Sequence, residues 1–125
     1  METLADQFLE LRPDQRRVVH FALCEYALHK WTRYASAQGR IQYIESVVGT
    51  QQEVDIQLPV DALDAAKKED VKFAYYALYN LFRKYAQREV VDDWLIVNQA
   101  LSSEKDSRKR QVLLASALQE AICCG

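Results

Sequence analysis

Scarcity of glycine and proline is the feature that most limits what this chain can fold into. Only three Gly and two Pro occur in its 125 residues, whereas an all-β protein needs such residues at its many tight turns. The chain is instead rich in Ala, Leu, Gln, Arg and Lys, which favour helix. We therefore expect a mainly α fold: a compact bundle of five to six helices, forming a single helical domain over residues 1–125.

Hydrophobic residues recur at helical intervals in most of the chain. The expected helices span residues 3–11, 13–37, 60–68, 71–88, 93–101 and 108–122. The predicted N-caps, each just before or at the start of an expected helix, are Thr3, Asp70 and Asp92. The residues expected to face the core are Val18, Phe21, Ala22, Leu28 and Trp31 in the second segment, Ala74, Ala77, Leu78, Leu81, Phe82 and Tyr85 in the fourth, and Val112, Leu113, Leu118 and Ile122 in the last.

Residues 41–58 carry an ambiguous pattern. Val54, Ile56 and Leu58 alternate with polar residues, which is typical of a half-buried strand. We favour a short β-hairpin here, turning near residues 49–50. The apolar residues of 41–48 fit a short helix equally well, so both structures remain open.

Charge and hydropathy argue against nucleic-acid and membrane partners. The formal net charge is −2, whereas broad nucleic-acid binding needs a strong positive field. The first apolar stretch is broken by Asp6, Glu10 and Arg12, unlike a signal peptide. No uncharged apolar run approaches the ~18 residues of a membrane span. We expect no nucleic-acid partner, no membrane partner and a cytoplasmic location, which an odd cysteine count also favours.

The residues best able to carry chemistry are His20, Cys24 and His29 in one predicted helix. His20 and Cys24 are four residues apart and share a face. Such a pair is compatible with a nucleophile and its base, or with two metal ligands. A buried cysteine beside an amphipathic histidine explains the pattern more simply. Cys123 and Cys124 are adjacent, unlike a spaced redox pair, and we expect them in an unstructured tail.

Other signatures of catalysis are missing from the sequence. Asp92 and Asp93 are adjacent carboxylates, but helix capping accounts for Asp92 and a favourable place in the first helical turn accounts for Asp93. No glycine-rich phosphate loop, His-Glu-x-x-His or Gly-x-Ser-x-Gly motif occurs. We therefore expect no enzyme, no catalytic residue, no metal site and no cofactor.

Three stretches together resemble a known group of proteins. They are YIESVVGT at 43–50, FAYYALYNLFRKYA at 73–86 and DDWLIVNQAL at 92–101. They resemble small helical immunity proteins of bacterial polymorphic toxin systems, over roughly residues 20–101. The resemblance implies a protein that neutralises a cognate toxin by tight binding, and it assigns no toxin-binding residue. The segment after residue 59 is short for this group.

The expected partner is accordingly a protein, with a toxin such as a nuclease as the candidate. Nucleases are often cationic, and acidic inhibitors associate with them quickly. The candidate acidic binding patch consists of Glu53, Asp55, Asp61, Asp64 and Asp93. Two rival functions stay open: a helical enzyme or metal protein that uses the His20, Cys24 and His29 set, and a homo-oligomeric adaptor. The chain is expected to be a monomer or a homodimer.

Overall fold

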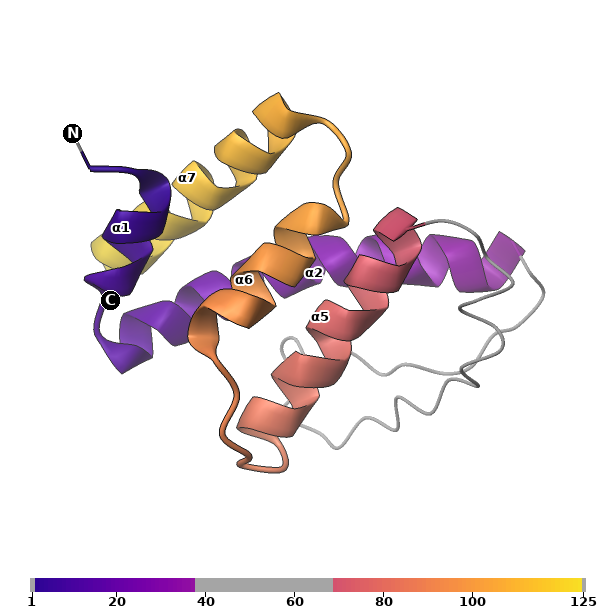
Figure 1. Ribbon diagram of the computed structural model, residues 1–125, viewed down its shortest axis with the longest axis horizontal. Coiled ribbons are helices and arrows are strands. Elements are labelled where there is room, and N and C mark those ends of the chain that lie inside the picture. Colours follow the sequence, from indigo (N-terminus) through magenta and orange to yellow (C-terminus); the bar gives the residue numbers. More distant parts are fainter. Residues whose placement is uncertain (1, 38–68, 125) are drawn as a thin grey trace.

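The computed structural model describes residues 2–37 and 69–124, which form a bundle of α-helices (Figure 1). This described part is 81% helical, with five helices and no strand. The predicted mainly α fold is confirmed. The β-hairpin expected over 41–58 and the helix expected over 60–68 lie outside the described residues.

Helix α1 (Leu4–Leu9) begins with a capping box at Thr3. The Thr3 hydroxyl accepts a hydrogen bond from the Asp6 backbone N–H at 3.1 Å, and the Asp6 carboxylate accepts one from the Thr3 N–H at 3.2 Å. These bonds satisfy backbone donors that the first helical turn leaves free. Helix α1 contributes Phe8 to the core.

Helix α2 (Pro13–Ala37) is the central element and packs against α5, α6 and α7. Figure 1 shows α5 and α6 crossing one side of it. Its buried residues are Val19, His20, Leu23, Cys24, Ala27 and Trp31. The predicted inward stripe was therefore only partly right. Trp31 is buried, whereas Val18, Phe21, Ala22 and Leu28 are partly buried and pack against the edge of the core. Because α2 contacts three helices, partly buried apolar residues flank its buried face, and periodicity alone does not identify the centre of that face.

Helix α5 (Glu69–Tyr85) has the stripe that the sequence predicts. The buried members are Ala74, Ala77, Leu78 and Leu81, while Phe82 and Tyr85 are partly buried against the core. The expectation that Asp70 caps this helix was wrong, because α5 already includes Glu69. The Asp70 carboxylate is instead 3.1 Å from Lys30 Nζ on α2.

Helix α6 (Asp93–Ser102) follows its predicted N-cap, Asp92, whose carboxylate accepts a hydrogen bond from the Trp94 N–H at 3.2 Å. Helix α7 (Ser107–Cys124) buries Leu114, Ala117, Leu118 and Ala121. Of the residues expected in the core, Leu118 is buried and Leu113 is partly buried against it, whereas Val112 and Ile122 are exposed. Alanines make up half of the buried residues on α7, and their small side chains give a weak hydrophobic signal in the sequence. Cys123 lies within α7, and the expected unstructured tail was wrong there.

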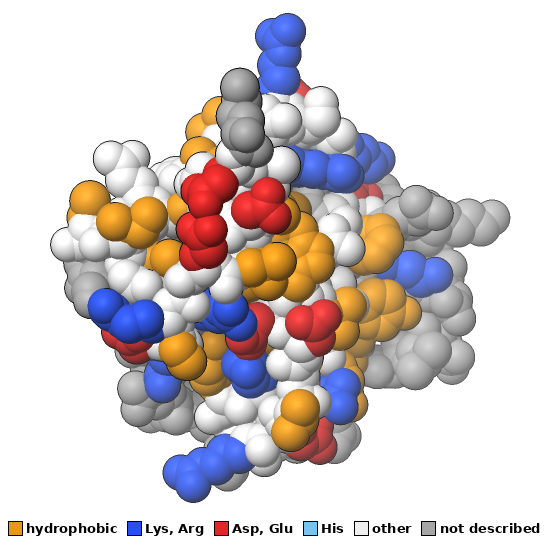
Figure 2. Space-filling view, turned by 60° about the vertical axis from the view of Figure 1, so that its left-hand side comes forward, with side chains coloured by type: hydrophobic (Ala, Val, Ile, Leu, Met, Phe, Trp, Pro, Cys, Tyr) orange, Lys and Arg blue, Asp and Glu red, His pale blue; other side chains and the backbone are white. Residues whose placement is uncertain are grey.

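The start of α2, the end of α5 and the start of α6 meet at one end of the bundle. Helices α5 and α6 are joined by residues 86–92, and both pack against α2. On the face shown in Figure 2, basic and acidic side chains lie close together, without a continuous surface of one sign. None of the helices within residues 2–37 and 69–124 combines the length and apolar character required to cross a bilayer.

Candidate functional site

His20 occupies the junction of α2, α5 and α6. Its side chain is 0% exposed, and both ring nitrogens have partners. Nε2 lies 2.8 Å from the backbone carbonyl oxygen of Asp93, and Nδ1 lies 2.6 Å from the Tyr85 hydroxyl oxygen. A carbonyl can only accept, so Nε2 carries the proton and Nδ1 accepts from the Tyr85 hydroxyl. Burial lowers the pKa of His20 below 6.5, so the ring is neutral at pH 7.

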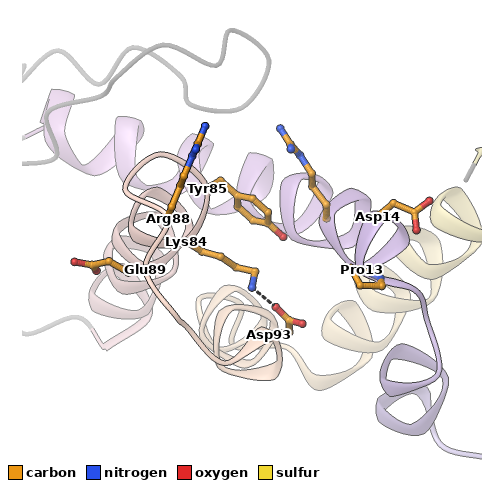
Figure 3. A pocket seen from close by; sticks show the side chains of 8 residues that line it. Pro13, Asp14, Lys84, Tyr85, Arg88, Glu89 and Asp93 are labelled. Carbon is orange, nitrogen blue, oxygen red and sulfur yellow. Dashed lines mark ion pairs between the residues drawn. The ribbon is translucent and has the colours of Figure 1, made fainter.

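The Asp93 carboxylate lies beside this histidine, between two cations. Arg16 Nη1 is 3.0 Å away and Lys84 Nζ is 2.8 Å away, the second pair being drawn in Figure 3. Burial acts to raise the pKa of Asp93, but hydrogen bonds from Lys84 and Arg16 outweigh it and lower the pKa below its ordinary value. Arg16 also donates to the carbonyls of Leu9 and Leu11. One arginine thus connects the end of α1 to the start of α6.

Aromatic rings enclose the histidine. Phe8 lies 5.7 Å from the His20 ring and 5.8 Å from Trp94, centroid to centroid. Tyr85 lies 5.7 Å from His20 and 5.2 Å from Phe21. These rings exclude water from the hydrogen-bonded nitrogens, which is why burial is the largest influence on the pKa of His20. Burial likewise raises the pKa of Tyr85, which therefore stays protonated and able to donate.

A cleft of about 510 Å³ opens beside this network. Its lining residues are Pro13, Asp14, Arg17, Lys84, Tyr85, Arg88, Glu89 and Asp93. Figure 3 shows the Lys84–Asp93 pair on one side of the cleft, with Tyr85 above it and Arg88 extending away from it. The cleft is thus bounded by the outer edge of the buried network, while His20 itself lies behind Tyr85 and does not line it.

A second polar network lies at the other end of α5. Asp70 is 3.1 Å from Lys30 Nζ and 3.9 Å from Lys105 Nζ. Lys30 also donates to the Ser103 carbonyl at 2.5 Å, and Tyr26 donates to the Glu104 carboxylate. This network fixes the turn between α6 and α7 against α2.

The structure does not bring the predicted set of His20, Cys24 and His29 together. His20 and Cys24 are fully buried, whereas His29 is exposed. The Cys24 Sγ lies 3.9 Å from the Ala77 carbonyl oxygen, and burial raises the pKa of this thiol. Among the described residues, no group of three His, Cys, Asp or Glu side chains is arranged to hold a metal ion.

The predicted acidic patch falls mostly outside the described residues. Glu53, Asp55, Asp61 and Asp64 all lie there. Its fifth member, Asp93, has a side chain only 20% exposed and paired with two cations. Asp93 therefore contributes to helix packing, and its charge is largely balanced within the bundle.

The sequence interpretation missed Arg16 and Lys84 as partners of Asp93, and Tyr85 as the partner of His20. One signal was available: Arg16 and His20 are four residues apart and so share a face of α2. The hydrogen-bond partners of that face come from α5 and α6, more than sixty residues along the chain. Spacing within one helix carries no information about them.

Comparison with known proteins finds no matching family model, no similar curated protein and no similar solved structure.

Proposed function

We propose that this chain is a non-enzymatic binding protein, an immunity-type inhibitor that neutralises a cognate bacterial toxin in the cytoplasm by direct protein–protein contact. The observation that carries the proposal is the burial and hydrogen bonding of His20. Its side chain is fully buried, and both ring nitrogens form hydrogen bonds that join helices. A general base must come within about 3 Å of the proton it removes, directly or through one water. His20 in this position stabilises the bundle instead.

Cys24 supports the same inference. Its thiol is fully buried, and its raised pKa disfavours the thiolate that a cysteine nucleophile requires. The two side chains best suited to act as a base or a nucleophile, His20 and Cys24, thus contribute to packing. A scaffold held in this way suits recognition, because a preformed surface loses little conformational entropy on binding.

The toxin as partner rests on two sequence observations. The stretches at 43–50, 73–86 and 92–101 resemble immunity proteins of polymorphic toxin systems. Glu53, Asp55, Asp61 and Asp64 concentrate negative charge in one segment, and acidic surfaces steer cationic proteins into productive encounters.

The test is binding of the full chain to the toxin-like product of the neighbouring gene. One variant replaces the four carboxylates of the segment, with Glu53→Gln, Asp55→Asn, Asp61→Asn and Asp64→Asn. The matched control replaces four exposed carboxylates elsewhere, at Glu2, Glu10, Glu25 and Glu120, each by Gln. Both variants change the net charge equally, so they separate local steering from total charge.

We expect saturable binding by the unmodified chain and an association rate at least about tenfold lower for the segment variant at low ionic strength. The control variant is expected to change the rate much less. Absence of a toxin-like neighbour, or of binding to its product, contradicts the toxin assignment. Equal losses in the two variants contradict the assignment of the acidic segment as the binding surface.

Self-association is the second candidate, and exposed tyrosines on α5 favour it. Tyr76 is 38% exposed and Tyr79 is 42% exposed, beside the buried Tyr75. Tyrosine is enriched at protein interfaces because it combines a large apolar ring with a polar tip. Sedimentation of the full chain decides: a monomer at high concentration contradicts a homodimer formed through these residues.

A further inference from the structure

We propose that the cleft between α2 and the end of α5 binds a phosphate group, through the guanidinium groups of Arg17 and Arg88. This site is separate from the acidic segment assigned above to the protein partner, and the two proposals stand independently. Four observations support it: the charge balance of the cleft, the position of Arg17, the backbone of Arg88 and the size of the cavity.

The carboxylates that line the cleft are already neutralised by cations. The pairs are Asp14 with Arg12, Glu89 with Arg83, and Asp93 with both Arg16 and Lys84. Arg17 and Arg88 line the same cleft, and neither pairs with a carboxylate within the described part of the chain. The carboxylates of the lining are thus paired, while the two arginines have no anionic partner among the described residues and favour an anion in the cleft.

Arg17 is held in place by aromatic rings. Its guanidinium carbon lies 5.2 Å from the ring centroid of Phe21 and 5.2 Å from that of Tyr85. Contacts of this kind hold the planar guanidinium by cation–π attraction and leave its N–H donors free at the edge. Tyr85 in turn is fixed by its hydrogen bond to His20. The buried network therefore orients a cation at the cleft.

Arg88 occupies an unfavourable backbone conformation. Its φ of 57° lies in the left-handed region, where the chain reverses after α5 and the Glu89 N–H reaches the Arg83 carbonyl at 2.9 Å. Glycine is the usual residue at such helix ends because it has no Cβ to clash. An arginine at this position is strained, and such strain occurs preferentially at functional sites. Figure 3 shows the Arg88 side chain extending from this turn, away from the Lys84–Asp93 pair.

The cavity volume indicates the size of ligand. About 510 Å³ falls within the range of small-molecule sites. Pro13 and the ring of Tyr85 give the cleft apolar surface beside the two arginines. Two guanidinium forks match the oxygens of a phosphate group, and the apolar surface suits an organic body attached to it. We infer a small phosphate monoester as the ligand class.

The test is an NMR titration of ¹⁵N-labelled full chain with inorganic phosphate and, separately, with phenyl phosphate. We expect saturable shifts at the Arg17 and Arg88 side-chain signals, with tighter binding of phenyl phosphate. Equal affinity for the two probes assigns the site to free phosphate and overturns the monoester class. Absence of saturable shifts with either probe up to about 10 mM, an affinity weaker than most specific small-ligand sites, overturns the site.

Arg88→Gly separates binding from folding. Removing the strained side chain is expected to raise the Tm by about 4 °C, while the loss of one charge-assisted donor group weakens phenyl phosphate binding about tenfold. Arg17→Gln is expected to weaken binding similarly. Arg108→Gln removes an exposed cation elsewhere, on α7, and serves as the matched control. Equal weakening by the control, or unchanged binding in Arg88→Gly, contradicts the proposal.

Discussion

Two aspartates, Asp93 and Asp70, lie near opposite ends of α5, and each is placed between two cations. Both cations of Asp93 have side chains 26% exposed. At Asp70 one cation is comparably buried, but Lys105 is 75% exposed and 3.9 Å away. Similar charges therefore act in different solvent environments. Ion-pair composition alone therefore does not set stability, because water screens the open pair of Asp70 and Lys105 far more than the enclosed pairs of Asp93.

A second difference is the neutral histidine at the Asp93 end. His20 donates to the Asp93 backbone carbonyl and accepts from Tyr85, so it joins three helices by hydrogen bonds that carry no net charge. At the Asp70 end, the corresponding links are a lysine to a carbonyl and a tyrosine to a carboxylate, both at the turn after α6. We expect the Asp93 end to be the more sensitive of the two to substitution.

The largest expected effect comes from His20→Ala. The change leaves a cavity among aromatic rings and removes the partners of two buried polar groups, so it should lower the free energy of unfolding by about 4 kcal/mol. Urea denaturation measures this loss. His29→Ala is the matched control, since His29 is exposed, and it should change stability by less than about 0.5 kcal/mol. Similar losses in both variants would contradict the structural role of His20.

Neutralising each aspartate compares the two ends directly. Asp93→Asn leaves Arg16 and Lys84 without a counter-charge in a partly enclosed site. It should lower the free energy of unfolding by about 2 kcal/mol. Asp70→Asn should lower the free energy of unfolding by less than about 1 kcal/mol. Lys105 is solvated, and Lys30 retains its hydrogen bond to the Ser103 carbonyl. Chemical denaturation of both variants at pH 7 and low salt tests the order. Equal losses of stability, or a larger loss for Asp70→Asn, would contradict the greater sensitivity expected of the Asp93 end.

The pH dependence of stability should also distinguish the ends. The folded pKa of His20 is lowered below 6.5, so above pH 6.5 both folded and unfolded histidine are neutral. Below 6.5 the unfolded chain takes up a proton that folded His20 resists, and stability falls by up to about 1.4 kcal/mol per pH unit until the folded pKa is reached. Comparison of denaturation curves at pH 7.5 and 5.5 for the unmodified chain and His20→Gln isolates this contribution. A slope retained in His20→Gln would assign it to other groups.

The carboxylates act in a separate, lower window. The pKa values of Asp93 and Asp70 are both lowered below 3.8. Their contribution to stability is therefore present above pH 3.8 and is lost as the pH falls through the folded pKa.

The smallest expected effect lies on α7, away from both ends. Val112 is 67% exposed, so Val112→Ser should change the free energy of unfolding by less than about 0.5 kcal/mol. Leu114→Ala, at a buried position that the sequence did not assign to the core, should lower the free energy of unfolding by about 3 kcal/mol. Thermal denaturation of the pair tests which of the two residues faces the core. A large loss at Val112 with little loss at Leu114 would show that Val112 is a core residue, as the sequence predicts.

Local patterns correctly predicted the buried face of α5 and the caps at Thr3 and Asp92, though not the cap at Asp70. The α5 stripe is clear because one face meets the core while exposed Tyr76 and Tyr79 lie opposite. The caps at Thr3 and Asp92 depend on contacts over two or three residues. The buried face of α2 was harder to predict, since this helix packs against three others. On α7 the prediction was right for Leu118 and wrong for Val112 and Ile122, because the buried alanines there give a weak hydrophobic signal.

The candidate site depended on contacts that no local pattern contains. Arg16 reaches Asp93 across 77 positions, and His20 reaches Tyr85 across 65. The sequence correctly indicated that Cys24 is a buried residue, but His29 was grouped with it on helical spacing alone. Arg88 was placed at the end of a predicted helix, and its left-handed backbone has no signature in the residue type.

The most direct test of this account is the state of the His20 ring in the full chain. Long-range ¹H–¹⁵N spectra across a pH series distinguish the two neutral tautomers and the charged form. We predict the Nε2–H tautomer at pH 7, with protonation only below pH 6.5. A ring protonated on Nδ1, or one that titrates at or above pH 6.5, would contradict the assignment of His20 as a neutral residue that joins helices.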